Sequence, residues 1–251
     1  AVARLRAACL AHDEARPRLD RGEARKPRCE GCRLAPSHCA CALRPRVPTR
    51  AGMCLLMAAF EALKPSNTGW LVADVVPDTH AFAWSRTAVD PALLALLADP
   101  QWRPVVVFPG EFAAPGRVVT ELAPAPSDDG RRPLFILLDG TWAEARKAFR
   151  KSPFLDRFPV LSLDASHSRY RLRSAWHEHH LCTAEIASLC LAMAGDRHAA
   201  RTLQAWLDVF SERYLCAKQS VAPDERDPSH ETLRGLRGVD SGGVAIGPTT
   251  G

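Results

Sequence analysis

The chain has 251 residues, of which 47% are hydrophobic, and its 33 basic and 28 acidic side chains give a formal net charge of +5. This length and apolar content suffice for one sizeable hydrophobic core and exclude a disordered chain. No apolar run reaches the roughly 20 residues that a membrane-spanning helix needs, and the N-terminal residues lack the apolar centre of a signal peptide. We therefore expect a cytoplasmic protein with no membrane partner, and no obligatory protein partner is evident.

Basic residues are unevenly distributed along the chain. Residues 1–50 have a local net charge of +7 and residues 146–173 one of +6, although the whole chain has only +5. Arginine supplies 28 of the 33 cations. This bias favours either phosphate recognition by guanidinium groups or the codon preference of a GC-rich genome.

The first 50 residues predict a short helix and a small irregular module. The helix is expected at residues 4–16. Residues 17–50 are rich in proline, arginine and cysteine and show neither helical nor strand periodicity, which is typical of a module held together by a metal ion. We therefore expect a boundary at residue 50, followed by a larger catalytic domain at residues 51–217.

From Gly52 onward, short apolar runs alternate with helical patterns. The runs predict buried strands at Cys54–Ala58, Ala81–Trp84, Val105–Phe108, Leu134–Leu138 and Val160–Leu163. The segments between and after them predict helices at Thr68–Val76, Pro91–Ala98, Trp142–Lys151, Thr183–Ala194 and Arg197–Tyr214. This alternation favours an α/β fold with a parallel sheet, whose ligand lies at the carboxyl ends of the strands. Residues 218–251 are expected to form a partly disordered tail.

Four of the nine cysteines lie within thirteen residues, at Cys29, Cys32, Cys39 and Cys41. Their spacing lets a short loop surround one ion tetrahedrally, and zinc is preferred because it accepts four thiolates without redox chemistry. An iron–sulfur cluster and free thiols are the alternatives. A closed site of four cysteines predicts a structural role. Arginines around it, among them Arg33, predict that the module presents a basic surface.

The segment Lys64-Pro-Ser-Asn-Thr-Gly69 follows a predicted strand and opens a predicted helix. Ser66 or Asn67 suits the N-cap, with Thr68 and Gly69 near the first turn. Backbone amides at such a position favour a carboxylate or a phosphate. An ordinary helix start uses the same residue types, so the pattern alone does not decide between a ligand site and a cap.

The segment Asp139-Gly-Thr-Trp142 places an acid at the carboxyl end of a strand, followed by a glycine that allows close approach of a ligand. Thr141 and Glu144 have the spacing of a capping box. That capping role needs neither Asp139 nor Trp142, so these two residues are candidates for chemistry.

Two basic stretches follow this segment. The first lies on one face of the predicted helix, because its members are spaced by four residues: Arg146, Lys147, Arg150 and Lys151. Like charges at this spacing repel each other unless a polyanion meets them, so they predict contact with RNA; a solvated basic face is the alternative. The second stretch alternates cations with apolar residues and includes Arg169 and Arg171.

The segment Leu181-Cys-Thr-Ala-Glu185 opens the next predicted helix. Thr183 is a candidate cap for that helix. Glu185 then lies in the first turn, where the helix dipole favours a carboxylate.

In order and spacing, the four-cysteine pattern, Glu61-x-x-Lys64-Pro-Ser-Asn-Thr-Gly69, Asp139-Gly-Thr-Trp142 and Leu181-Cys-Thr-Ala-Glu185 resemble the DTW-domain family over roughly residues 28–216. Its members are tRNA-uridine aminocarboxypropyltransferases. The resemblance implies a fold related to the SPOUT methyltransferases, with a C-terminal trefoil knot, and S-adenosylmethionine as co-substrate. It also implies transfer of the 3-amino-3-carboxypropyl group to N3 of uridine 47 in the tRNA variable loop.

The family resemblance and the chemistry of the reaction together indicate which residues form the site. N3 of uracil is a weak acid, so the transfer needs a positioned base, and Asp139 is the candidate, with Trp142 beside it as a second catalytic candidate. The predicted co-substrate residues are Lys64, Ser66, Asn67, Thr68, Gly69, Pro109, Gly110, Asp139, Gly140, Thr141, Leu181, Thr183 and Glu185. The sulfonium is itself the activated leaving group, so the reaction requires no second cofactor.

One position departs from the family pattern. Ala58 stands three residues before Glu61, where family members usually have histidine, so either that histidine has no essential role here or the activity is impaired. Two other functions stay open: an S-adenosylmethionine-dependent RNA methyltransferase of the same fold, and a zinc-stabilised RNA-binding protein without activity.

Overall fold

The computed structural model describes residues 1–11, 27–58, 60–122, 130–163 and 181–239. Within them lies one sheet of six parallel strands in the order β2-β1-β5-β3-β6-β4. Its strands are β1 (Gly52–Met57), β2 (Thr79–Ala83), β3 (Trp102–Val107), β4 (Val118–Val119), β5 (Arg132–Asp139) and β6 (Val160–Leu161). The predicted α/β fold with a parallel sheet is confirmed. The sequence analysis missed β4, because two residues show no periodicity.

The helices are α1 (Val2–Ala11), α2 (Gly69–Val75), α3 (Pro91–Ala98), α4 (Trp142–Arg150), α5 (Thr183–Met193), α6 (Arg197–Gln219) and α7 (Pro228–Val239). The bounds of α3 are those predicted, because Pro91 occupies its first turn and the Asp90 side chain accepts a hydrogen bond from the Ala92 amide at 2.8 Å. Of the helix predicted at residues 4–16, residues 12–16 lie outside the described part.

Helix α7 was not predicted, since it falls in the segment expected to be a tail. Its sequence contains two glycines, which disfavour a helix in isolation. The helix packs against α6, and Leu233 is fully buried. Tertiary packing therefore stabilises this helix despite its weak propensity. The preceding helix α6 also continues past its predicted end at Tyr214.

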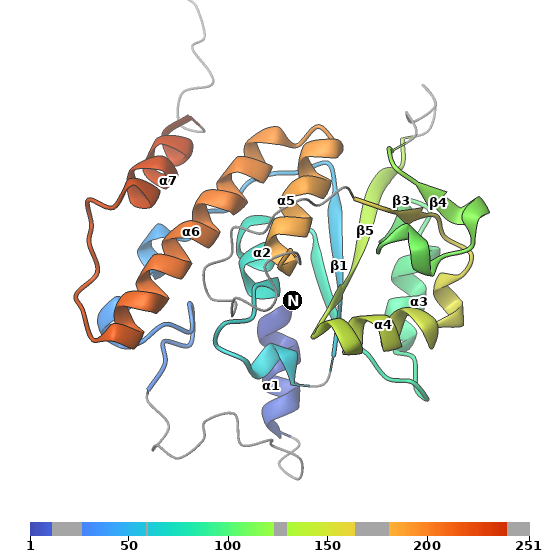
Figure 1. The fold of residues 1–251 in the computed structure, drawn as a ribbon, viewed down its shortest axis with the longest axis horizontal. Coiled ribbons are helices and arrows are strands. Elements are labelled where there is room, and N and C mark those ends of the chain that lie inside the picture. The colour runs from blue at the N-terminus through green and yellow to red at the C-terminus, as the bar shows by residue number, and fades with distance from the viewer. Residues whose placement is uncertain (12–26, 59, 123–129, 164–180, 240–251) are drawn as a thin grey trace, which may run out of the picture.

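Helices cover both faces of the sheet (Figure 1). Successive strand residues point to opposite faces. On one face, Met53 and Leu55 share a core with α2, α5 and α6. On the other face, Cys54 and Leu56 share a second core with α3 and α4. All six residues of β1 are therefore buried, as expected for a parallel sheet with helices on both sides.

The N-terminal module packs onto the larger of these two cores. Its residues Cys32, Leu34, Ala40 and Val47 belong to the same buried cluster as β1 and α6. The imidazole Nε2 of His38 lies 2.7 Å from the Val221 carbonyl oxygen. The division of the chain at residues 50 and 217 stays a prediction. Nowhere in the described ranges is a helix both long enough and apolar enough to cross a bilayer.

Candidate active site and metal site

Asp139, the last residue of β5, lies where three segments of the chain meet. Its side chain is 5% exposed. Carboxylate oxygen Oδ2 accepts a hydrogen bond from Asn67 Nδ2 at 2.8 Å, and Oδ1 accepts one from Thr183 Oγ1 at 2.6 Å. The backbone oxygen of Asp139 accepts from the Ala58 amide at 2.8 Å. The structure thus brings together the three motifs that the sequence analysis placed on separate loops.

The close packing around this carboxylate explains a glycine of the first motif. A Cβ atom at Gly69 would lie 2.6 Å from Asp139 Oδ2, well inside van der Waals contact. The missing side chain lets the start of α2 approach the end of β5. The absence of a side chain at Gly69 therefore leaves room for the Asp139 carboxylate and its contact with Asn67.

Two of the predicted helix caps are wrong. The N-cap of α2 is Thr68, whose side chain makes no capping hydrogen bond; the Asn67 side chain is used for Asp139 instead. The N-cap of α5 is Cys182 rather than Thr183, because the Thr183 hydroxyl is likewise used for Asp139. Burial raises the pKa of the Cys182 thiol to about 12, so this cap is neutral.

Two other expectations about the helix starts are confirmed. Helix α4 begins with a capping box, in which Thr141 Oγ1 accepts from the Glu144 amide and Glu144 Oε2 accepts from the Thr141 amide at 2.8 Å. Glu185 lies in the first turn of α5, and its Oε2 accepts from the Cys182 amide at 2.7 Å.

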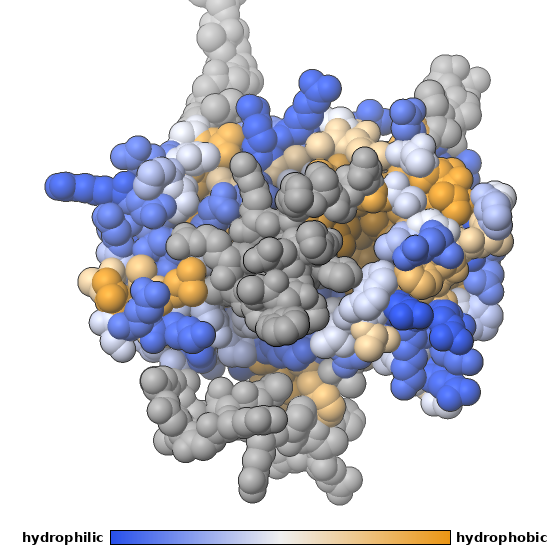
Figure 2. All heavy atoms as spheres, in the orientation of Figure 1, coloured by the Kyte–Doolittle hydropathy of each residue, from blue (hydrophilic) through white to orange (hydrophobic). Residues whose placement is uncertain are grey.

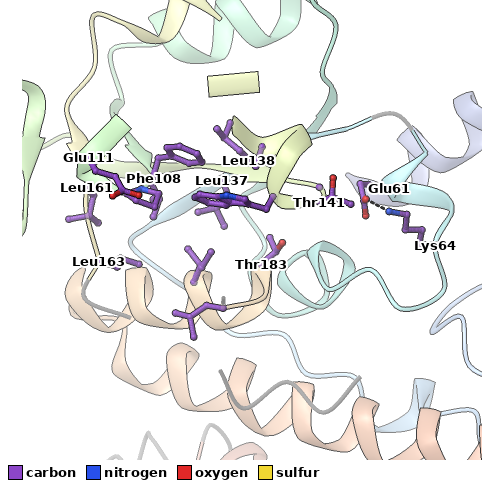
Figure 3. Close-up of a pocket in the computed structure, with 17 residues that line it drawn as sticks. Glu61, Lys64, Phe108, Glu111, Leu137, Leu138, Thr141, Leu161, Leu163 and Thr183 are labelled. Carbon is purple, nitrogen blue, oxygen red and sulfur yellow. Dashed lines mark hydrogen bonds and ion pairs between the residues drawn. The ribbon is translucent and has the colours of Figure 1, made fainter. Parts of the chain in front are cut away.

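A pocket of about 560 Å³ opens beside this junction, at the carboxyl ends of β3, β5 and β6 (Figure 3). Its volume is in the range of small-molecule and cofactor sites. Seven predicted residues line it: Lys64, Pro109, Gly140, Thr141, Trp142, Leu181 and Thr183. The other predicted residues are not among those that line it: Ser66, Asn67, Thr68, Gly69, Gly110, Asp139 and Glu185. Their part in binding stays a prediction.

The apolar wall of the pocket was missed by the sequence analysis. It consists mainly of residues at strand ends and on α5: Val107, Phe108, Leu137, Leu138, Leu161, Leu163 and Ile186. The Phe108 ring stacks on Trp142, with ring centroids 5.5 Å apart and an interplanar angle of 12°. Trp142 remains 37% exposed. The available signal was the position of most of these residues at or next to the carboxyl ends of predicted strands, the edge at which a parallel sheet binds its ligand.

A charged pair, Glu61 and Lys64, lies at one end of the pocket (Figure 3). Glu61 is 5% exposed, forms an ion pair with Lys64 and accepts a hydrogen bond from Asn67 Nδ2 at 3.3 Å. Burial raises the pKa of the Glu61 carboxyl group, and Lys64 opposes that shift. Sequence analysis quoted Glu61 as part of a motif but did not place it in the site.

The four predicted metal ligands lie together. All four Sγ atoms of Cys29, Cys32, Cys39 and Cys41 are within 4.8 Å of one another, and Cys29 Sγ lies 3.5 Å from Cys39 Sγ and from Cys41 Sγ. Tetrahedral zinc with Zn–S bonds of about 2.3 Å places its sulfur atoms about 3.8 Å apart. The cluster could therefore hold one zinc ion.

The backbone around the cysteines also fits a metal site. A Cβ atom at Gly31 would lie 2.6 Å from Cys41 Sγ, so the loop can close around the sulfurs only with glycine there. A hydrogen bond from the Cys32 backbone amide lowers the pKa of the Cys29 thiol, whereas burial raises the pKa of the Cys32 and Cys41 thiols. Cys29 therefore forms the thiolate, which is the form that binds metal, more readily than these two cysteines.

Arg33 is not part of a basic surface, contrary to the prediction. Its side chain is 3% exposed, and its guanidinium group lies 4.6 Å from the centre of the Trp70 ring and 5.2 Å from that of Phe210. Its Nη1 donates to the backbone oxygens of Asn67 at 2.8 Å and Pro65 at 3.3 Å. The side chain points inward because the two carbonyl oxygens accept hydrogen bonds from the guanidinium group and the two aromatic rings make cation–π contacts with it.

The basic residues of α4 and of its C-cap, Lys151, are exposed. Arg146, which is nearest to the start of the helix, is connected to the wall of the pocket through aromatic contacts. Hydrophilic side chains gather over α4 at the lower right of Figure 2, and all four predicted cations, Arg146, Lys147, Arg150 and Lys151, are exposed. The Arg146 guanidinium lies 5.0 Å from the centre of the Phe112 ring. That ring in turn packs edge-on against Trp142. Contact with RNA stays a prediction, and Arg169 and Arg171 lie outside the described residues.

Fold and site together define an α/β protein with a pocket at the carboxyl edge of a parallel sheet and a separate cysteine cluster. The sequence matches the family model of the DTW domain over residues 26–215. The chain therefore belongs to the DTW-domain family, and the predicted family membership is confirmed. No solved structure matches the chain significantly.

Proposed function

We propose that this protein transfers the 3-amino-3-carboxypropyl group of S-adenosylmethionine to N3 of a uridine in tRNA. Membership of the DTW-domain family is consistent with a role in tRNA modification. The observation that carries the proposal is the convergence of the family motifs on one pocket: Lys64, Thr141 and Thr183 line it from three separate segments. The proposed target within tRNA is uridine 47, and the proposed place of the reaction is the cytoplasm.

The pocket suits a ligand with an apolar aromatic part and a charged end. Adenine stacks favourably on aromatic rings, and the exposed Trp142 ring beside Phe108 offers such a surface. Gly140 and Thr141, which precede this ring in the sequence, also line the pocket and are available to the rest of the ligand. The SPOUT relationship and the trefoil knot belong to this proposal as well.

The chemistry that S-adenosylmethionine supplies is a sulfonium leaving group. A bond forms between uracil N3 and the methylene carbon of the aminocarboxypropyl arm that is bonded to sulfur. The bond between that carbon and sulfur breaks at the same time. Its electron pair stays on sulfur, which leaves as neutral 5′-methylthioadenosine, and the N3 proton passes to a base.

Asp139 is the proposed base. Asn67 and Thr183 fix the orientation of its carboxylate by donating one hydrogen bond to each oxygen. Each oxygen has a second lone pair that can accept a proton. The role requires N3 of uracil to come within hydrogen-bond distance of this carboxylate, directly or through one water molecule.

Mass spectrometry of tRNA nucleosides tests the proposal. Purified protein incubated with unmodified tRNA and S-adenosylmethionine should produce a uridine that carries the aminocarboxypropyl group, together with 5′-methylthioadenosine. A methylated nucleoside and S-adenosylhomocysteine would instead identify an RNA methyltransferase. Binding of tRNA with neither product, and without binding of S-adenosylmethionine, would identify an RNA-binding protein. The same comparison in cells that lack and regain the protein identifies the tRNA and the position.

A further inference from the structure

We infer that Glu61 and Lys64 form a subsite for the amino-acid end of the co-substrate, with Glu61 binding the α-ammonium group and Lys64 the α-carboxylate. This inference rests on the proposed function and assigns one part of the ligand to one end of the pocket. If the inference is right, Glu61 and Lys64 distinguish adenosyl compounds that have the amino-acid arm from those that lack it.

The first argument is the distribution of charge within the pocket. Most of its lining is apolar, whereas Glu61 and Lys64 stand side by side at one end (Figure 3). The exposed Glu111 lines the pocket among the apolar residues away from this pair. An amphipathic ligand that fills such a pocket places its charged groups at the charged pair and its apolar groups along the apolar wall.

The second argument is that the pair is neutral overall. A buried charge is stable only when an opposite charge compensates it. The pair already satisfies this condition, since the Lys64 ammonium compensates the buried Glu61 carboxylate. A zwitterionic amino-acid group adds one charge of each sign, so it leaves the net charge at this end of the pocket unchanged, including the contribution of the nearby Asp139 carboxylate. A ligand with only an ammonium or only a carboxylate changes that net charge by one unit.

The third argument concerns the support behind the pair. Asn67 Nδ2 donates to Glu61 Oε2 at 3.3 Å and also to Asp139 Oδ2 at 2.8 Å. The subsite and the proposed base therefore share one supporting side chain. Anchoring the α-carbon at Glu61 and Lys64 fixes the reacting methylene carbon, which lies two bonds away, relative to Asp139. Such fixed positioning is how an enzyme selects one of several reactive carbons.

One consequence concerns release of the product. The transfer moves the amino-acid arm from the nucleoside to tRNA, so 5′-methylthioadenosine has no group for Glu61 or Lys64 to bind. We expect the protein to hold this product less tightly than the co-substrate for that reason.

The test uses isothermal titration calorimetry of the full-length protein with two pairs of ligands, a sulfonium pair and a thioether pair, and within each pair the two ligands differ only in the arm. S-adenosylmethionine and S-adenosylhomocysteine have both charged groups, decarboxylated S-adenosylmethionine has only the ammonium, and 5′-methylthioadenosine has neither. We expect the wild type to bind S-adenosylhomocysteine about tenfold or more tightly than 5′-methylthioadenosine. Decarboxylation of S-adenosylmethionine should weaken its binding by a similar factor.

Two variants assign these preferences to the pair. Lys64→Met keeps an unbranched side chain of nearly the same length, removes the ammonium group, and should abolish the penalty for decarboxylation. Glu61→Gln should reduce the preference for S-adenosylhomocysteine over 5′-methylthioadenosine to about twofold or less. Glu111→Gln removes a different pocket carboxylate and should retain the wild-type ratio between these two ligands. The ratios, rather than single affinities, separate loss of the subsite from general damage to the pocket.

The outcomes distinguish this inference from the proposed function. Wild-type preferences in a folded Lys64→Met variant would overturn the inference and leave the proposed function intact, and this variant suffices should Glu61→Gln fail to fold. A wild-type protein that modifies tRNA but binds 5′-methylthioadenosine as tightly as S-adenosylhomocysteine would also overturn the inference and leave the proposed function intact. A wild type that binds none of the four compounds would overturn both.

Discussion

The cysteine cluster and the pocket are assembled in opposite ways. The cluster uses four residues from one loop of thirteen, whereas the pocket draws its lining from segments that extend from Glu61 to Ile186. A local spacing was therefore enough to predict every proposed metal ligand. The pocket needed the sheet, because its polar residues and its apolar wall come together only where parallel strands end. A site whose residues are close together in the sequence can be predicted from the sequence, whereas a site assembled from distant segments can be predicted only in part.

Arg33 connects the two regions. It follows Cys32 directly, its backbone amide donates to the Cys29 oxygen at 2.7 Å, and its side chain donates to the Asn67 and Pro65 oxygens. The Asn67 side chain in turn holds Asp139. Arg33 thus links the cysteine cluster to the loop that supports the proposed active site. The predictions below test whether a change in one region affects the stability or function of the other.

The largest effect is expected for Cys32→Ser, which removes a metal ligand. The apolar strands after Gly52 suggest that the damage stays in the N-terminal module. However, Cys32 is 1% exposed and belongs to the same core cluster as β1 and α6. We therefore expect loss of bound zinc and a decrease of about 4 kcal/mol or more in the free energy of unfolding of the whole chain.

Metal analysis and urea denaturation measure both effects of Cys32→Ser. The control is Cys9→Ser, a thiol of α1 outside the cluster, which should keep the zinc and change stability by about 1 kcal/mol or less. Iron in place of zinc, or a variant that unfolds like the wild type, would contradict the prediction.

The next largest effect is expected for Arg33→Met, which keeps an apolar side chain between the Trp70 and Phe210 rings but removes the donors to two carbonyls. Leaving the buried Asn67 carbonyl oxygen and the partly buried Pro65 carbonyl oxygen without this partner should cost about 3 kcal/mol of unfolding free energy. Zinc should stay bound, because all four cysteines remain. Denaturation with zinc quantified in the same sample checks this, and a loss below about 1 kcal/mol would show that the two regions are independent.

Asp139→Asn should have a smaller effect on stability and a large one on transfer. An asparagine can accept from Asn67 through its oxygen and donate to the Thr183 hydroxyl through its amide, so we expect a loss of about 1 kcal/mol of unfolding free energy. It cannot take the N3 proton, so the rate of transfer should fall by about 100-fold or more. Single-turnover assays with S-adenosylmethionine binding measured in parallel test this. Wild-type turnover would remove Asp139 as the base, and a parallel collapse of binding would assign it a positioning role.

The smallest effects are expected for Arg150→Ala and Lys151→Ala at the end of α4. If this face tracks tRNA phosphates, each loss should weaken tRNA binding at low salt. The log–log slope of affinity against salt should decrease by about one unit or less. S-adenosylmethionine affinity should not change, and Lys218→Ala, an exposed cation at the end of α6, serves as the control. Unchanged tRNA affinity in both variants would show that the face is merely solvated.

The strands and most helices were predictable because their signals are local. Buried strands of a parallel sheet are continuous apolar runs, and α4 opens with a capping box that four residues encode. Helix α7 and strand β4 were missed, since the first depends on packing against α6 and the second has only two residues.

Within the site, residue types were predictable but their tasks were not. Asn67 and Thr183 look like helix caps in sequence, and in the structure both hydrogen-bond to Asp139. Arg33 looks like a surface cation and is buried between aromatic rings. In each case a partner far away in sequence outcompeted the local interaction, and a partner of that kind has no signature at the residue itself.

The sequence by itself determined the class of fold and the four cysteines of the cluster, because each depends on composition or on the spacing of nearby residues, and its motifs carried the resemblance to the DTW-domain family that the family model confirms. Only the tertiary structure decided that Asp139 joins three motifs, that Glu61 and Lys64 share an otherwise largely apolar pocket, and that the module packs on the main core. The physical reason is the parallel sheet: it brings the carboxyl ends of strands to one edge, so that Asn67 and Thr183, which lie 72 and 44 positions from Asp139 in the sequence, come within hydrogen-bond distance of its carboxylate.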